Sequence, residues 1–248
     1  LRLTLQRSAA QERVRAYYRK KITDPWTLIG QDLFPAVMSQ PLLGVAVTSH
    51  AAGTLATATF SNVRAGALMT GWTVANVGAT SGSASTDGTV FDVTGGGADI
   101  WGTSDQFSYL YQEWNGDGTI VARVRSLQHA HAWSKAGVMF RETIAADAQQ
   151  VDMIVTPSKG IAMQVRGATG EVTTGAGSGA GAAPGWVRLS RVGDSFTAEW
   201  SKDGATWTTL GQATVPMPPT ILVGLAVTSH NTSAMAAASF DDVILKQP

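Results

Sequence analysis

Residue types that are absent or rare in this sequence exclude several kinds of site and partner. None of its 248 residues is cysteine, which excludes a disulfide framework and any thiolate metal site. Charged residues make up only 15% of the chain and balance at 18 basic against 18 acidic, which argues against nucleic acid or an anionic membrane as the main partner. No apolar run approaches the ~18 residues of a membrane span. The chain is long enough to form a buried core without covalent crosslinks.

The residues that are present are typical of a β protein. Glycine is abundant at 27 residues, and short segments alternate apolar and polar side chains between glycine-rich turns. In TIVARVR (119–125), for example, Ile120, Ala122 and Val124 share one face, and IAMQVR (161–166) alternates in the same way. Many short strands without a convincing long helix predict an all-β fold, an antiparallel β-sandwich of the jelly-roll type.

One phrase occurs twice, as GVAVTSH at residues 44–50 and as GLAVTSH at residues 224–230. The agreement extends without a gap over residues 42–63 and 222–243, at an offset of 180. Internal repeats fix the unit of structure. We therefore expect strands in both copies, each with a polar turn at its histidine.

The repeat also divides the chain. Upstream of the shared phrase, Trp26 and Gly30 align with Trp207 and Gly211 after one residue of slippage. Residues 1–63 are therefore predicted to be the C-terminal part of a preceding repeat, and residues 64–248 a complete β-sandwich module. Because the sequence opens on a strand-like LRLT without Met, we expect it to be a fragment of a longer protein.

One segment of the first copy has a local helix signal. SAAQERVRAYYRKK combines good helix formers with the capping-box spacing of Ser8 and Gln11. Its counterpart in the second copy, SRVGDSFTAEWSKDG, has a Gly-Asp turn followed by inward alternation, which indicates a hairpin. We therefore predict strands in both copies.

Several segments of the second copy resemble a known kind of module. They are GGGADIWGTSDQFSYLYQEWNGDGTIVARV (95–124), KAGVMFRET (135–143), APGWVRLSR (183–191) and, near the end, GLAVTSHN with ASFDDV. Together they resemble a bacterial accessory module with a concanavalin A-like, laminin G-like β-sandwich, found in secreted and often carbohydrate-active proteins and often in tandem. The resemblance covers residues 70–245. It implies the lectin/glucanase type of jelly roll, a secreted or cell-surface location and carbohydrate binding.

Catalysis is not expected. Glycosidases need two carboxyl groups about 5–10 Å apart, and β-glucan-cleaving relatives of this fold carry a Glu-x-Asp-x-x-Glu strand that no segment here matches. Glu113 and Asp117 flank a turn and Glu142 begins a loop, as solvated charges commonly do. TSGSAS (80–85) and AGSGAG (176–181) lack the strand-to-helix context of a nucleophilic serine. The chain is predicted not to be an enzyme.

No cofactor is required by these patterns, and calcium is the one metal considered. Sandwiches of the resembled class often hold calcium through backbone carbonyls and one or two carboxylates. Asp99 and Asp105, which bracket the IWGTS loop, are the calcium candidates. His129 and His131 could place two imidazoles on one face, or simply lie exposed beside a loop.

Aromatic residues are the most suggestive feature for ligand binding, because sugar rings present apolar faces to aromatic platforms. Six aromatic side chains fall within the 33 residues from Trp101 to Trp133. Alternation places Phe107, Tyr109 and Tyr111 on one strand face, where they either fill the sandwich or meet a ligand. For the turn-borne tryptophans, packing and binding are both open. The candidate ligand-binding residues are Trp101, Tyr109, Tyr111, Trp114, Trp133 and His131.

Two functions follow. The first is a non-catalytic carbohydrate-binding accessory module of a larger secreted bacterial protein, with a polysaccharide or cell-surface glycan as its partner. The alternative is a structural or adhesive tandem repeat of a cell-surface or filament-forming protein, in which neighbouring copies pair in cis or in trans. Neither function involves nucleic acid or a membrane span.

Overall fold

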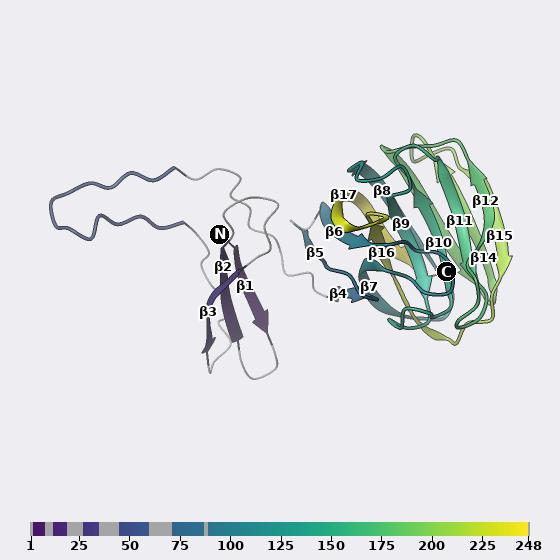
Figure 1. The fold of residues 1–248 in the computed structure, drawn as a ribbon, viewed down its shortest axis with the longest axis horizontal. Helices are drawn as coiled ribbons and strands as arrows, with labels where there is room; N and C mark the ends of the chain where they lie inside the picture. Colours follow the sequence, from purple (N-terminus) through teal and green to yellow (C-terminus); the bar gives the residue numbers. More distant parts are fainter. Residues whose placement is uncertain are drawn as a thin grey trace. The chain divides into compact units, whose positions relative to one another are not determined.

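The fold was determined as a computed structural model, and the structure describes residues 2–7, 12–18, 27–34, 45–59, 71–86 and 89–247. Every helix or strand assigned within these ranges is a β-strand, so they contain no helix that could cross a membrane. The chain divides into two units, residues 1–68 and residues 69–248 (Figure 1). Trp26 and the expected boundary between residues 63 and 64 lie outside the described ranges.

The first unit contains a three-stranded antiparallel sheet in the order β1-β2-β3. Glu12–Tyr18 is a strand, so the prediction of a strand over the local helix signal is confirmed there, while Ser8 and Gln11 lie outside the described residues. The strands are β1 (Arg2–Arg7), β2 (Glu12–Tyr18) and β3 (Thr27–Phe34).

The second unit is built from two seven-stranded sheets, and every strand pairing in it is antiparallel. The first, here the β16 sheet, has the order β12-β11-β10-β9-β16-β7-β4; the second, the β17 sheet, has the order β15-β14-β13-β8-β17-β6-β5. The strands are β4 (Thr73–Val77), β5 (Gly82–Thr86), β6 (Phe91–Gly97), β7 (Phe107–Asn115), β8 (Gly118–Leu127), β9 (Lys135–Arg141), β10 (Gln150–Val155), β11 (Ile161–Arg166), β12 (Thr174–Gly179), β13 (Gly185–Val192), β14 (Ser195–Ser201), β15 (Thr208–Thr214), β16 (Thr220–Thr228) and β17 (Asn231–Lys246).

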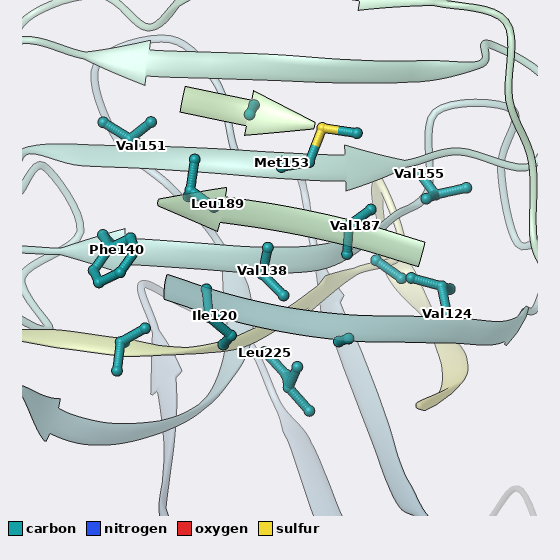
Figure 2. Packing of buried hydrophobic residues seen from close by; sticks show 14 of the residues in the cluster. Ile120, Val124, Val138, Phe140, Val151, Met153, Val155, Val187, Leu189 and Leu225 are labelled. Atoms are coloured by element: carbon teal, nitrogen blue, oxygen red, sulfur yellow. The ribbon is translucent and has the colours of Figure 1, made fainter. Parts of the chain in front are cut away.

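The main core lies between the two sheets. Ile120, Ala122 and Val124 of β8 point inward as predicted and are fully buried. Phe140 of the β16 sheet meets Phe196 of the β17 sheet edge-to-face, with ring centroids 5.7 Å apart. Figure 2 shows Phe140 with Ile120 and Leu189 in this core. Each such apolar side chain stabilises the fold by about 1.5–3 kcal/mol through burial. The two packed antiparallel sheets confirm the predicted fold class, an all-β antiparallel sandwich.

A second, smaller apolar cluster covers the outer face of the β16 sheet. Phe107 and Tyr109 of β7 belong to it, whereas Leu110 of the same strand points into the main core. Tyr109 is fully buried and its hydroxyl donates a hydrogen bond to the carbonyl of Met139 at 2.9 Å. Ile100, from the loop that joins β6 to β7, completes the cover. The aromatic row therefore shares one face as predicted, but it fills the space under this loop rather than the space between the sheets.

Candidate functional site

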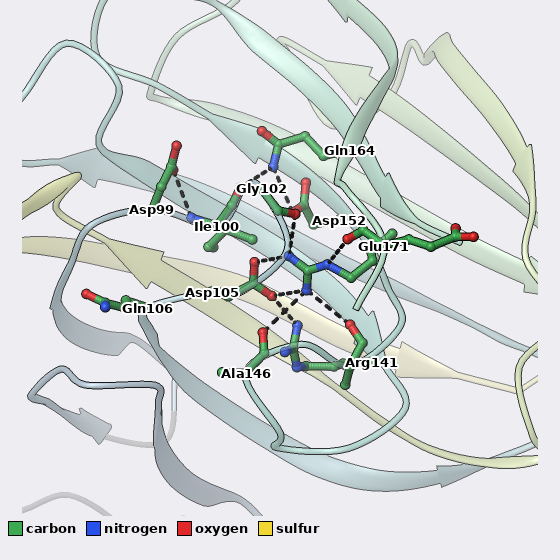
Figure 3. Close-up of polar contacts among 12 residues, drawn as sticks. Asp99, Ile100, Gly102, Asp105, Gln106, Arg141, Ala146, Asp152, Gln164 and Glu171 are labelled. Carbon is green, nitrogen blue, oxygen red and sulfur yellow. Dashed lines mark hydrogen bonds and ion pairs between the residues drawn. The ribbon is translucent and has the colours of Figure 1, made fainter. Parts of the chain in front are cut away.

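The loop of residues 98–106 lies against the outer face of the β16 sheet and carries Trp101. Two polar side chains of the sheet donate hydrogen bonds to it, and Figure 3 shows one of them, Gln164, beside Ile100. Lys135 Nζ donates to the Ile100 carbonyl at 2.9 Å, and Gln164 Nε2 donates to the same oxygen at 3.1 Å. Both side chains are almost completely buried. The position of Trp101 is thus set by contacts to strands β9 and β11.

Asp105 anchors the other end of this loop. Its carboxylate accepts hydrogen bonds from Arg141 Nη1, Arg166 Nη1 and Arg166 Nη2, each at 2.6 Å, and all three side chains are fully buried. Burial lowers the pKa of Arg141 from its ordinary value, while Asp105 acts in the opposite direction. Because both carboxylate oxygens are engaged by guanidinium groups, a calcium ion at Asp105 would meet cations instead of free ligands. Asp105 is therefore a structural anchor and not a metal ligand.

Asp152 is a second buried carboxyl group beneath the loop. Gln164 Nε2 donates to Asp152 Oδ2 at 3.0 Å. Burial raises the pKa of Asp152 to about 8, although the nearby charge of Lys135 and the hydrogen bond from Gln164 act to lower it. The side chain therefore carries a proton at neutral pH, which reduces the cost of enclosing it.

Asp99 joins the loop to the exposed surface. Its Oδ1 lies 2.6 Å from Lys135 Nζ and also accepts a hydrogen bond from the backbone N–H of Ile100 at 2.8 Å. Lys135 Nζ lies 5.5 Å from the ring centroid of Trp101, within cation–π range. The indole of Trp101 remains 43% exposed. Its ring is therefore fixed on one side and open to solvent on the other.

Two stacked imidazoles continue this surface. His230 Nδ1 lies 3.1 Å from Asp99 Oδ2, and the rings of His230 and His131 stack with centroids 4.4 Å apart. His131 Nδ1 accepts a hydrogen bond from the backbone N–H of Trp133 at 3.1 Å. In a neutral ring that leaves His131 Nε2 as the protonated nitrogen, available as a donor. Trp133 itself is 42% exposed, with Lys159 Nζ 5.7 Å from its ring centroid.

These contacts connect two half-exposed indoles through a continuous series of polar groups. We call the assembly the Trp101–Trp133 surface, and its members are Trp101, Lys135, Asp99, His230, His131 and Trp133. A shallow hollow of about 340 Å³ adjoins the His131 loop through His129 and is lined by Arg125, Ser126, Leu127, His129, Thr156, Pro157, Ala182 and Ala183. Fixed aromatic faces, donors and an adjacent hollow are features of ligand sites in general.

The remaining predicted residues lie elsewhere. Trp114 is near the far end of β7, roughly 25 Å along the strand from the 98–106 loop. It packs on the main core and donates through Nε1 to the carbonyl of Asp117 at 3.2 Å. Tyr111 is half-buried and stacks on Tyr109 at 5.2 Å. Tyr109, being fully buried, offers no face to a ligand, so its assignment as a binding residue is corrected.

The structure also assigns positions that sequence patterns did not indicate. Lys135 and Lys159 each lie beside a partly exposed indole. Lys135 begins the segment KAGVMFRET, but nothing in that segment indicates a contact with Trp101. His230 lies in the polar turn predicted at the end of its strand, and it contacts Asp99 of the 98–106 loop. Asp99 has Lys135 and His230 beside its two oxygens, and the described part of the chain contains no group of three or more His, Cys, Asp or Glu residues able to hold a metal.

Comparisons with known proteins concern the fold. No protein-family model and no curated protein sequence matches this chain. Among solved structures, a functionally unknown protein from Saccharomyces cerevisiae superposes with a TM-score of 0.58 at 17% identity, covering 72% of this chain and 97% of that one. At this identity the likeness shows a shared fold.

Two other structures are more distant. The exoplasmic/lumenal domain of VIP36, in a Ca²⁺/Man₃GlcNAc-bound form, gives a TM-score of 0.45 at 8% identity, covering 73% of this chain and 88% of that one. Xylan β-1,4-xylosidase from Bacillus halodurans C-125 gives 0.44 at 16% identity, covering 63% of this chain and 33% of that one. Their names describe those proteins, and the site of this chain must be argued from its own residues.

Proposed function

We propose that the second unit is a non-catalytic carbohydrate-binding module that contacts sugar rings through the Trp101–Trp133 surface. The observation that carries the proposal is the pair of indoles, 43% and 42% exposed, that polar contacts hold in place on neighbouring loops. A sugar ring offers an apolar C–H face to such an indole and hydroxyl groups to its polar neighbours. His131 directly contacts Trp133, and its Nε2 is the donor that we expect to bind a sugar hydroxyl beside that indole.

The charges around the surface favour a neutral polymer as the ligand. Between the indoles, Lys135 is paired with Asp99, so these two charges compensate each other, and Lys159 lies beside the ring of Trp133. The chain as a whole is also balanced in charge. We therefore infer an uncharged polysaccharide or glycan as the ligand class.

A binding role fits the carboxyl groups of this region better than hydrolysis does. Asp105 is enclosed with two arginines, Asp152 is buried and protonated, and Asp99 is paired with Lys135 and His230. A glycosidase needs two carboxyl groups that both reach the scissile bond. Within the described residues of this surface, none of the three aspartates is free to act in this way.

We place the module in a larger secreted or cell-surface protein, as the resemblance of its sequence implies. There, binding to a polymer would raise the local concentration of any attached domain on that polymer. Calcium is not needed in this proposal, because cationic side chains already engage Asp99 and Asp105. Retention on the polymer should therefore be the same with and without a chelator.

The first test is retention of the full chain on a panel of insoluble neutral polysaccharides. Trp101→Ala and Trp133→Ala should each weaken binding to the retained polymer about tenfold in Kd, equivalent to about 1.4 kcal/mol. Depletion isotherms measure the change. The matched control is Trp207→Ala, because Trp207 also lies beside a cation, with Arg188 Cζ 4.1 Å from its ring centroid, but on the β17 sheet.

Trp207→Ala should bind as the unmodified chain does. Equal losses in all three variants would point to general destabilisation and contradict the assignment, as would failure of every polymer to retain the unmodified chain. Near-UV circular dichroism of each variant establishes that the sandwich remains folded.

A further inference from the structure

The three-stranded sheet of the first unit repeats the geometry of strands β13–β15. In the first unit, Ala16 of β2 pairs with Gly30 of β3, and the register shifts directly after Ala16. In the second unit, Ala198 of β14 pairs with Gly211 of β15, and the register shifts directly after Ala198. The same pair of residue types therefore precedes the same irregularity in two antiparallel three-stranded arrangements.

The histidine turn is repeated as well. Ser49 Oγ donates to the carbonyl of residue 51, and the N–H groups of His50 and residue 51 donate to Thr48 and Ser49 side chains. The corresponding bonds join Thr228, Ser229, His230 and Asn231. The two histidines have nearly the same left-handed backbone, with φ of 56° and 54°. Both copies thus form one local structure.

The surroundings of the two copies differ. In the second unit the residues before the turn belong to β16, which pairs with β7 and β9, and Leu225 and Val227 are fully buried. Their equivalents in the first copy, Val45 and Val47, are 56% and 47% exposed. Residues 45–59 form no strand, so the strand expected in the first copy of the repeated phrase is wrong for these residues. The first copy therefore presents apolar side chains where the second has neighbouring strands.

Gly30 gives an independent indication of a missing neighbour. A methyl group built on its equivalent, Gly211, would lie 2.1 Å from the carbonyl oxygen of Ala176 in β12. Glycine is thus required there by the close approach of two backbones. Among the described residues, a methyl group built on Gly30 would have no atom within 4 Å. Gly30 therefore has the residue type for a strand like β12, but no such strand lies beside it in the described part of the chain.

We infer that the described segments within residues 2–59 belong to the closing third of a second β-sandwich and bind, as their partner, a polypeptide with the sequence character of residues 69–184. Strands like β7 and β9 would flank residues 45–48, and a strand like β12 would pass Gly30. The finished second unit of another copy does not fit this role, because its β7 and β9 are already joined by its own β16. The partner must therefore carry strands like β7 and β9 without a strand like β16 between them.

The test supplies that partner covalently, by fusing a duplicate of residues 64–186 in front of residue 1 of the full chain. Hydrogen exchange of the backbone amides at residues 45–48 is then compared between the fusion and the unmodified chain. We expect exchange at least about 100-fold slower in the fusion, because these amides would become part of a sheet ladder inside a core. Comparable exchange rates in both proteins would overturn the inference.

Substitutions test whether the protection arises from burial of Val45 and Val47 in a new core or from nonspecific association. Val45→Asp with Val47→Asp in the fusion should abolish the protection, because a charge would enter the new core at each position. Val192→Asp is the matched control, since Val192 is 68% exposed, and it should leave the protection intact. Protection that survives the double substitution, or that arises in the unmodified chain at high concentration, would also overturn the inference, the latter by identifying a second copy as the partner.

Discussion

Replacing Asp105 by asparagine is expected to destabilise the second unit by about 3–5 kcal/mol, the usual cost of leaving a buried charge without its partner. Asp105 meets the guanidinium groups of Arg141 and Arg166 at 2.6 Å, and all three side chains are fully buried. Asparagine keeps the volume of aspartate but removes the negative charge that both arginines share. Urea unfolding followed by intrinsic tryptophan fluorescence measures the loss of free energy.

Two further variants separate the charge effect from lost packing. Glu199→Gln removes the partner of Arg188 in a pair that water partly reaches, and it should cost about 1 kcal/mol or less. Arg141→Met added to Asp105→Asn should recover part of the stability, because it removes one of the two uncompensated guanidinium groups. A further loss in the double variant would contradict the explanation.

Since Asp105 anchors the loop that carries Trp101, Asp105→Asn should also weaken polysaccharide binding.

The second large effect concerns pH. As the pH rises from about 4 to about 8, the unmodified chain should lose stability relative to Asp152→Asn. Burial raises the pKa of Asp152 to about 8 in the folded state, from the ordinary value of 3.8. Over that range the folded state keeps a proton that the unfolded state has released, so the stabilisation is complete below the ordinary pKa and is lost as the pH rises to about 8. A shift of this size corresponds to an upper limit on the order of 5 kcal/mol.

The measurement is the difference in unfolding free energy between the unmodified chain and Asp152→Asn at intervals from pH 4 to pH 8. A difference is needed because it cancels the contributions of groups common to both chains. Asp203 has the opposite sign: hydrogen bonds from the backbone of Thr206 and Ala205 and from Ser201 hold its pKa below the ordinary value, so its contribution to stability is lost only as the pH falls below about 4. A pH-independent difference would show that Asp152 is ionised in the folded state throughout.

The fold was predictable because its signals are local. Alternation of Ile120, Ala122 and Val124 requires only the two-residue period of a strand, and the structure buries all three as expected. The repeat also correctly favoured a strand over a helix at residues 12–18. The second copy has a clear Gly-Asp turn before this strand, whereas the first copy has a helix-like sequence at the same place. The two-residue alternation and the internal repeat were sufficient to predict strands, because a strand depends mainly on residues that are neighbours in the chain.

The site was only partly predictable because its contacts are distant in sequence. Asp105 lies 36 residues from Arg141 and 61 from Arg166, and no spacing rule connects them. An aspartate beside a loop is therefore equally compatible with a metal ligand and with a buried anchor. Tyr109 shows the same limit, because alternation placed it on a face without revealing that the 98–106 loop covers that face. Trp101 and Trp133 lie in turns and are partly exposed, as their positions in the sequence indicate, and their role in binding stays a prediction.

The positions of β16 and β17 have a consequence for synthesis on the ribosome. They are the last described strands of the second unit, yet β16 lies between β9 and β7, and β17 between β8 and β6. Chains emerge from the N-terminal end, so the two parts of each sheet cannot be joined until residues 220–246 leave the exit tunnel. The nascent unit therefore keeps open strands until these residues have been made, and truncation before residue 220 leaves it without an interior strand of either sheet.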